Sequence, residues 1–255
     1  MKIMGILNAT PDSFSDGGRF LDPDAAVRRA VAMAADGADI IDVGGESTRP
    51  GATPIGWEEE WSRIEPALRG LGACGALRGA AISVDTYHPE TAERAVAAGA
   101  AIVNCVYAVA VPAMLEILAA NPGVELVMPA KSFPLLSSLF PAPSSLFPLS
   151  RIYLDPMIGF GTTREEDFAL LRSVPELARK GRVLVGASRK RIVRTLAGES
   201  CADSVLGGDV AVALWCMANG ASVVRVHDVR EVAQAVKVMR QLSKPALSTP
   251  ARDMV

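Results

Sequence analysis

Residues 3–20 read IMGILNATPDSFSDGGRF, and this stretch decides how the chain folds. It opens with a short apolar run, Ile3 to Leu7, that has the length of a buried strand. Polar residues follow at once, and Gly17 and Gly18 close the segment. A buried strand that empties into a polar, glycine-terminated loop is typical of the carboxyl end of the sheet in an α/β enzyme. An ordinary strand and turn would give the same local pattern.

The same arrangement recurs along the chain, and the repetition favours the enzyme interpretation. Further strands are predicted at 38–43, 80–84, 101–103, 124–128, 151–154, 182–185 and 222–226. Helices are predicted at 22–36, 57–70, 89–98, 111–120, 164–179, 202–219 and 229–242. Eight strands that alternate with about seven helices predict an α/β fold of the (β/α)₈ TIM-barrel type. A doubly wound open sheet is the alternative, but no G-x-G-x-x-G turn follows the first strand.

One helix of that pattern is expected to be missing or irregular. The segment 132–150, after the fifth strand, is rich in proline and repeats the sequence SSLFP at 137–141 and 144–148. Proline at this density prevents a regular helix. The segment is expected either to cover the barrel wall or to form a homodimer contact. We expect one barrel domain over residues 1–245 and a tail over 246–255.

Size and composition limit the classes of function. The chain has 255 residues, a net charge of −2 and no basic stripe, which argues against nucleic acid as a partner. No apolar run reaches ~18 residues and no signal-peptide pattern is present, so we expect no membrane span. The cysteines lack metal-like spacing and are expected to be reduced thiols of a cytoplasmic protein. They are Cys74, Cys105, Cys201 and Cys216.

Polar residues that end or follow the strands are the candidates for a site, because barrel active sites lie at that end of the strands. They are Asn8, Asp42, Asp85, Asn104, Asp155, Lys190, Arg225 and His227. Burying an uncharged polar group without a partner costs about 2–7 kcal/mol, so these groups should pair with one another and with a ligand. The alternative is that they cap helices and form turns, which applies most to Asp85 and Asp155. Lys190 and Arg225 cap the N-terminus of no predicted helix.

The charges of these residues predict a ligand with two different ends. The cations Lys190, Arg225 and His227 come from strands seven and eight, where barrels often bind phosphate. The carboxylates of strands three and six and the amide of strand four suit a nitrogen-rich ring with N–H donors. Asn8 is a candidate ligand for a hard divalent ion that is held mainly by phosphate oxygens and water.

Longer motifs resemble one known family. Residues 6–18, ILNATPDSFSDGG, and 42–52, DVGGESTRPGA, are similar to the first two signatures of dihydropteroate synthase. Later motifs of the family are matched in order by ISVDT at 82–86, DP at 155–156, GFG at 159–161, SRK at 188–190 and RVHDV at 225–229. The resemblance implies a barrel enzyme that joins p-aminobenzoate to 6-hydroxymethyl-7,8-dihydropterin diphosphate. Diphosphate would leave and 7,8-dihydropteroate would form, a step of folate synthesis.

The resemblance also implies roles for individual residues. The pterin would be held by Asp85, Asn104, Asp155 and Lys190, of which Asp85 and Lys190 would be catalytic. The diphosphate would be held by Thr48, Arg225 and His227, and magnesium by Asn8. The p-aminobenzoate pocket would be formed by Phe14, Arg49, Pro50, Phe160 and Lys190. The two loops that carry Phe14 and Arg49 would close over the site.

The sequence departs from the family pattern on strands four to six. Cys105 stands where an Asp is usual, Pro129 where a His is usual, and Met157 where a Gly is usual. We expect an active synthase with a remodelled fifth unit. The alternative is a diverged pterin-binding paralogue, either a methyl-pterin-dependent methyltransferase-like protein or a non-catalytic binding protein. A methyltransferase would not need both loops and the SRK motif, and an idle cluster of cations would bring no packing benefit.

Overall fold

The eight predicted strands close into a barrel, which confirms the (β/α)₈ fold. The computed structural model describes residues 1–9, 23–47, 52–135 and 149–243. The strands are β1 (Lys2–Asn8), β2 (Ile40–Gly44), β3 (Ala81–Asp85), β4 (Ile102–Asn104), β5 (Glu125–Pro129), β6 (Ile152–Asp155), β7 (Arg182–Val185) and β8 (Val223–Val226). Neighbouring strands are parallel and follow the order of the chain, and β8 pairs with β1 to complete the ring.

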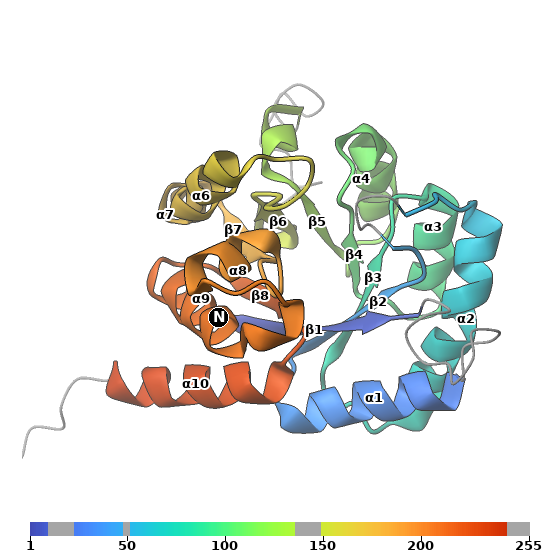
Figure 1. Cartoon of the computed structure of the whole chain (residues 1–255). Helices are drawn as coiled ribbons and strands as arrows, with labels where there is room; N and C mark the ends of the chain where they lie inside the picture. The colour runs from blue at the N-terminus through green and yellow to red at the C-terminus, as the bar shows by residue number, and fades with distance from the viewer. Residues whose placement is uncertain (10–22, 48–51, 136–148, 244–255) are drawn as a thin grey trace, which may run out of the picture.

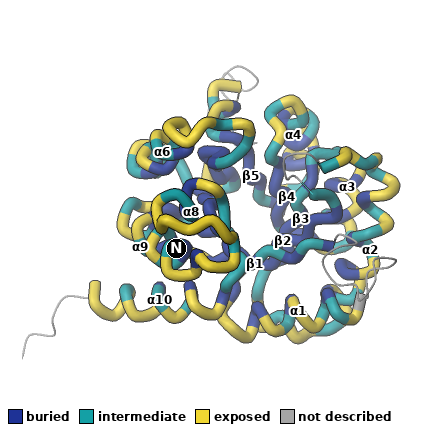
Figure 2. Tube along the Cα trace, in the orientation of Figure 1, coloured by how far each residue is buried: buried dark blue, intermediate teal, exposed yellow. Residues whose placement is uncertain are grey.

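Helices surround the strands on the outside of the ring (Figure 1). They are α1 (Pro23–Asp36), α2 (Trp57–Cys74), α3 (Pro89–Ala97), α4 (Val111–Ala120), α6 (Arg164–Arg172), α7 (Val174–Lys180), α8 (Arg191–Ala197), α9 (Leu206–Ala218) and α10 (Val229–Leu242). Figure 2 shows that the strands are buried and that the outer faces of the helices are exposed. Among the described residues, no helix combines the length and the apolar character that crossing a membrane requires.

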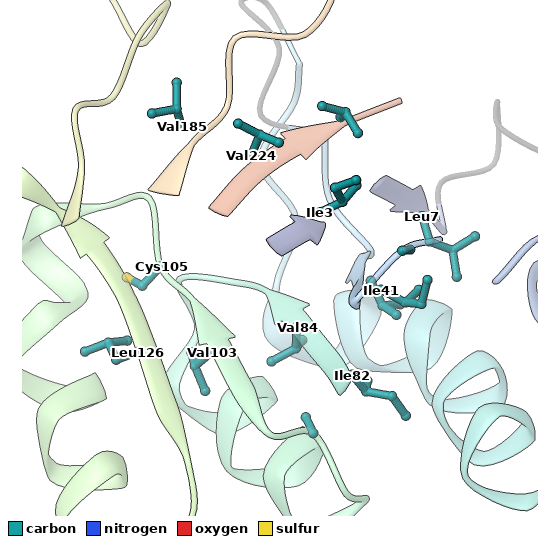
Figure 3. Close-up of a cluster of buried hydrophobic side chains, with 14 of the residues drawn as sticks. Ile3, Leu7, Ile41, Ile82, Val84, Val103, Cys105, Leu126, Val185 and Val224 are labelled. Carbon is teal, nitrogen blue, oxygen red and sulfur yellow. The ribbon is translucent and has the colours of Figure 1, made fainter. Parts of the chain in front are cut away.

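The larger core lies between the barrel wall and the helices, as successive strand residues point to opposite faces. Its strand residues include Ile3, Ile41, Val84, Val103 and Val224, all of them buried (Figure 3). A second core fills the interior of the barrel. It consists of Met4, Ile40, Ile102, Val127, Tyr153, Leu184 and Val223, which come from seven different strands. The barrel is therefore a packed core rather than a pore.

Three helical segments differ from the prediction. The helix predicted at 202–219 begins only at Leu206, after a 3₁₀ turn at Ala202–Ser204. The helix predicted at 164–179 is divided at Ser173 into α6 and α7. Helix α8 was not predicted, because its seven residues are too few to show a helical period. The signal that could have revealed it is Gly198, which ends the helix with a left-handed φ of 71°.

The irregular segment after β5 is described only in part. A 3₁₀ turn covers Ala130–Ser132, and the next three residues are helical. Residues 136–148, which carry the repeated SSLFP sequence, lie outside the described residues. The predictions that this segment lacks a regular helix and that it covers the wall or forms a homodimer contact fall there, as does the predicted tail at 246–255.

Candidate active site

Alternation along the strands places the polar residues of the sequence pattern inside the barrel. Asp42 lies two residues after Ile40, and Arg225 lies two residues after Val223, so each shares the inward face with a residue of the interior core. Asn104 likewise lies two residues after Ile102, another residue of the interior core. The apolar interior core therefore forms the floor, and the polar residues lie above it at the carboxyl ends of the strands.

Arg225 links three strands at the centre of this site. Its Nε donates to Asp42 Oδ2 at 2.6 Å, and one terminal NH₂ donates to Asp85 Oδ2 at 2.7 Å. Asn104 Nδ2 donates to the same oxygen of Asp42 at 3.0 Å. The charge pattern of the sequence predicts the cations and the carboxylates on two separate sides. The structure corrects this arrangement, because the cation of β8 lies directly against the carboxylates of β2 and β3.

The burial of these charges changes how they titrate. Burial raises the pKa of Asp85 to about 7; Arg225 opposes the shift and the Asp42 carboxylate adds to it. For Arg225 burial alone would lower the pKa, but the facing carboxylates Asp42 and Asp85 outweigh it, so the net shift is upward and the guanidinium stays charged. Asp85 therefore changes its charge near neutral pH while its partner does not.

Lys190 enters the site from the segment after β7. Its Nζ donates to the carbonyl of Ile158 at 2.7 Å and lies 4.4 Å from the centre of the Phe160 ring. Burial lowers the pKa of Lys190 to about 8, and Asp155 opposes that shift. The structure corrects one expectation, since Lys190 occupies the N-cap position of a helix that was not predicted, α8. Its side chain makes no capping bond there and turns to the site instead.

Asp155 serves both the site and a turn, so the two sequence interpretations both apply to it. Its Oδ1 accepts from the backbone N–H of Met157 at 2.7 Å. Burial raises the pKa of Asp155, and Lys190 opposes the shift. Asp85 does not cap the following helix, because the residue at the N-cap of α3 is His88.

The turn after Asp155 holds Met157 in the left-handed region, with a φ of 66°. We expect Met157→Gly to be more stable than Met157→Ala by about 1 kcal/mol, because only glycine adopts this φ without a steric cost. Both variants lose the buried side chain, so thermal unfolding of the pair measures the backbone effect. At exposed Ala211 in α9, replacement by glycine should instead cost about 1 kcal/mol. An alanine variant at 157 as stable as the glycine variant would contradict the left-handed φ.

His227 lies beside a serine and an aspartate that sequence analysis did not select. Ser188 Oγ is 2.8 Å from Asp209 Oδ2 and 3.0 Å from His227 Nδ1. Asp209 is buried and comes from helix α9. A single aspartate inside an apolar helix, LGGDVAVALWCMA, was the signal in the sequence, because a charge at such a position needs a partner.

A second missed cluster supports the start of the loop after β2. Glu46 Oε1 accepts from the Tyr87 hydroxyl at 2.9 Å, and Glu46 Oε2 lies 3.5 Å from His88 Nε2. Glu60 of α2 is buried and accepts from the Thr86 hydroxyl at 2.6 Å. These contacts join the β2 loop to the residues that directly follow Asp85.

Four of the predicted site residues lie outside the described residues: Phe14, Thr48, Arg49 and Pro50. Asn8, the predicted magnesium ligand, ends β1 and is half-buried. In the described parts of the chain, His, Cys, Asp and Glu form no group of three that could hold a metal. An amide oxygen at a strand end suits an ion that keeps most of its water and binds through a phosphorylated ligand.

Two buried acceptor oxygens of the site lack a hydrogen-bond donor within the described residues. Within the described residues, Asp42 Oδ1 and Asn104 Oδ1 have no hydrogen-bond partner although both atoms are buried. An unsatisfied buried acceptor costs about 1–3 kcal/mol, and a ligand with N–H donors would remove that cost. The arrangement therefore favours a ligand that carries donors into the barrel and presents negative charge to the cations at its rim.

Comparison with known proteins gives a consistent result. The family model described as pterin binding enzyme matches residues 4–133 and 142–227. The dihydropteroate synthase of Neisseria meningitidis serogroup C is 39% identical, over 94% of this chain and 92% of that protein. A structure of Xanthomonas albilineans dihydropteroate synthase with 4-aminobenzoic acid superposes with a TM-score of 0.84 and 38% identity, covering 96% of this chain and 94% of that one. Another structure of that enzyme, in complex with 7,8-dihydropteroate, gives 0.81 and 35%, with the same coverage.

Proposed function

Because the chain belongs to the dihydropteroate synthase family of pterin-binding enzymes, we propose that it catalyses the reaction of that family. It condenses 6-hydroxymethyl-7,8-dihydropterin diphosphate with p-aminobenzoate to form 7,8-dihydropteroate and diphosphate, a transferase step in folate synthesis. The single observation that supports this most is the set of buried acceptors around Asp42 and Asn104, which matches the N–H groups of an aminated ring.

We assign the inner part of the site to the pterin ring. Asp85, Asn104 and Asp155 present carboxylate and amide oxygens, which accept from ring N–H and amine groups. Lys190 lies over the Phe160 ring and interacts electrostatically with Asp155, so it would contact both the pterin and p-aminobenzoate. The rest of the p-aminobenzoate pocket is assigned to Phe14, Arg49 and Pro50.

We assign the rim beside β8 to the diphosphate. Arg225 carries five N–H donors, and in the described residues its Nη1 group makes no hydrogen bond. It would bind the diphosphate with this group while it keeps its two carboxylates. His227 and Thr48 complete the proposed diphosphate contacts, and Asn8 is the protein ligand proposed for Mg²⁺. When bound, the ion would offset the negative charge of the diphosphate.

The residues of the site suggest how the reaction proceeds. The bond between the pterin methylene and the diphosphate oxygen breaks as Arg225 and His227 stabilise the charge that develops on the leaving group. The methylene carbon becomes electron-poor, and the Asp85 carboxylate stabilises it. The amine of p-aminobenzoate attacks that carbon to form the C–N bond and then gives up a proton, which the released diphosphate accepts. The two loops would exclude water, which competes with the amine.

The departures on strands four to six are compatible with this function. Cys105 is buried, and burial raises its pKa to about 11, so the thiol is a packing residue and not a nucleophile. Pro129 ends β5, and the pairing register between β5 and β6 is intact.

Within the described residues all four cysteines are free thiols, which suits the cytoplasmic location that we propose.

Single-turnover formation of dihydropteroate tests the proposal. Purified protein is mixed with the pterin diphosphate, p-aminobenzoate and Mg²⁺, and the product is separated and quantified. We expect product only when both substrates are present. Binding of the pterin diphosphate without product would instead support the diverged paralogue, and absence of both would refute a pterin site.

The pH dependence of kcat/KM for the pterin diphosphate should be bell-shaped, with its maximum between pH 7 and 8. Asp85 gains its negative charge as the pH rises through about 7, and Lys190 loses its positive charge as the pH rises through about 8. The two limbs report macroscopic values of the free enzyme. Lys190→Arg keeps its charge at high pH, so the alkaline limb should disappear in that variant. A flat profile from pH 6 to 9 in the wild type would contradict both assignments.

A further inference from the structure

Asp167 on α6 is fully buried, although the sequence pattern does not single it out and the resemblance gives it no role. Its Oδ1 accepts from the backbone N–H of Gly159 at 2.7 Å and from the Thr162 hydroxyl. Its Oδ2 accepts from a terminal nitrogen of Arg191 at 3.0 Å. A buried carboxylate thus receives three donors, and two of them belong to the segment that carries Phe160.

The turn of residues 158–161 packs directly against Lys190. Lys190 Nζ donates to the Ile158 carbonyl at 2.7 Å and lies 4.4 Å from the centre of the Phe160 ring. A Cβ atom added at Gly159 would lie 3.1 Å from Lys190 Cδ, so the backbone of the turn touches the stem of the lysine. Gly159 has a φ of 79°, and glycine itself favours neither sign of φ. The position of the turn therefore depends on contacts from outside it.

The other polar contacts of this segment are more exposed or lie within it. Arg191 donates to the Thr162 carbonyl at 2.6 Å, but its side chain is 48% exposed. The Gly159 N–H also lies 3.2 Å from Thr162 Oγ1, a contact that does not attach the segment to any other element. Among the described residues, Asp167 is therefore the buried side chain that attaches this segment to α6.

We propose that Asp167 is a positioning residue that holds the Phe160 turn against Lys190, so that the ring and the ammonium group face each other before a substrate binds. The part of this pair in binding p-aminobenzoate rests on the proposed function, whereas the placement of the turn does not. Such a pair binds the arylamine without first ordering the turn, and this preorganisation lowers the cost of binding. The turn depends on the acceptor Oδ1 rather than on the charge of the carboxylate.

Two substitutions separate the acceptor from the rest of the side chain. In Asp167→Asn the amide oxygen takes the place of Oδ1, because an amide nitrogen there would face the N–H of Gly159. The amide nitrogen then faces Arg191, whose exposed side chain turns to water. Asp167→Leu is similar in size and has no acceptor, so the Gly159 N–H and the Thr162 hydroxyl lose their partner and the turn moves.

NMR of the lysine ε-methylene groups measures the placement of the turn in the ligand-free protein. A methylene group over the face of an aromatic ring is displaced upfield by the ring current, and Lys190→Arg and Phe160→Leu identify the signal and its cause. At pH 6, well below the Lys190 pKa of about 8, loss of the Asp167 charge does not remove the lysine proton. We expect the displaced signal in the wild type and in Asp167→Asn, and its loss in Asp167→Leu. Glu165→Leu, at an exposed position of the same helix, is the matched control and should keep the signal.

A displaced signal in folded Asp167→Leu, or no displaced signal in the wild type, would overturn the proposal. Hydrogen exchange of the Gly159 amide in the wild type is a test that does not depend on whether a variant folds. With the Asp167 carboxylate as its acceptor, this amide should exchange on the order of tenfold or more slowly than a free amide. Exchange at the rate of a free amide would also overturn the proposal.

Kinetic constants connect the placement of the turn with the proposed function. Asp167→Leu should raise KM for p-aminobenzoate on the order of tenfold, whereas Asp167→Asn should stay near the wild type. KM for the pterin diphosphate should change less, because Asp85 and Asn104 lie outside this turn. An unchanged KM for p-aminobenzoate in a variant that has lost the displaced signal would overturn the positioning role. A wild type without synthase activity would refute the proposed function, and the NMR result would still decide the placement of the turn.

Discussion

Replacement of Arg225 by methionine is expected to lower the free energy of unfolding of the ligand-free protein by about 3–5 kcal/mol at pH 8. The reason is the position of Arg225 between two carboxylates, with 2.6 Å to Asp42 and 2.7 Å to Asp85. Asp42 is fully buried, so its charge would lose its cation without gaining water. Chemical denaturation of the wild type and the variant, monitored by circular dichroism, measures the difference.

The loss should become smaller as the pH falls. A carboxyl group whose pKa is higher in the folded state than in the unfolded chain lowers stability in full above the folded pKa; this cost shrinks as the pH falls below the folded pKa and vanishes only near the unfolded pKa. For Asp85 the unfolded value is 3.8 and the folded value is about 7, and removal of Arg225 raises the folded value further. The variant should therefore recover part of its stability between pH 8 and pH 6.

Two further variants test the cause. Adding Asp42→Asn to Arg225→Met removes one unpaired charge and should restore part of the lost stability. Arg69→Met, which removes an exposed pair with Glu65 on α2, should change stability by less than about 1 kcal/mol. A loss in Arg225→Met that is the same at pH 6 and pH 8 and is not relieved by Asp42→Asn would mean that the carboxylates are not its source.

Replacement of Lys190 by alanine is expected to reduce the single-turnover rate by roughly 10²–10³-fold. The ammonium group donates to the Ile158 carbonyl, faces the Phe160 ring and interacts with the Asp155 charge, so it would orient the pterin and p-aminobenzoate together. Without it the two reactants lose a shared contact, and both the rate and the affinity for the pterin diphosphate should fall.

Lys180→Ala is the matched control, because this lysine lies on α7 in an exposed pair with Glu176. It should leave the rate unchanged. Lys190→Arg should recover only part of the activity, since a planar guanidinium cannot replace a compact ammonium group beside Ile158. Wild-type turnover by Lys190→Ala would remove Lys190 from the proposed site.

The barrel could be predicted because its signals are local and repeated. Each strand is a short apolar run, and most of the runs end in a polar residue, so the repetition of this pattern predicts the architecture. The same pattern placed Asp85, Asn104 and Asp155 at one end of the barrel. The alternation of side chains along a strand then orients these residues, because a polar residue two positions after an interior core residue points into the site.

Pairing between distant strands could not be predicted from the sequence. Arg225 and Asp42 are separated by 183 positions, and only closure of the ring places them at hydrogen-bond distance. Helix α8 is too short to show a period, so the setting of Lys190 was misjudged. The contact of Asp209 with the site runs through Ser188, which lies in a different segment of the chain, so the sequence pattern alone does not reveal it. Residue types therefore indicated the members of the site, and the three-dimensional register decided their partners.

The pairing of β8 with β1 also bears on how the protein is made. A ribosome releases the amino-terminal strand first and the carboxyl-terminal strand last. The ladder between β1 and β8, in which Lys2 is paired with Val223, can therefore form only after β8 has been made. Until then β1 and β7 are open edges, and Asp42 and Asp85 have no Arg225 to neutralise them. Closure of the ring and neutralisation of the two buried carboxylates therefore both depend on the last strand of the barrel, a contact of high sequence separation.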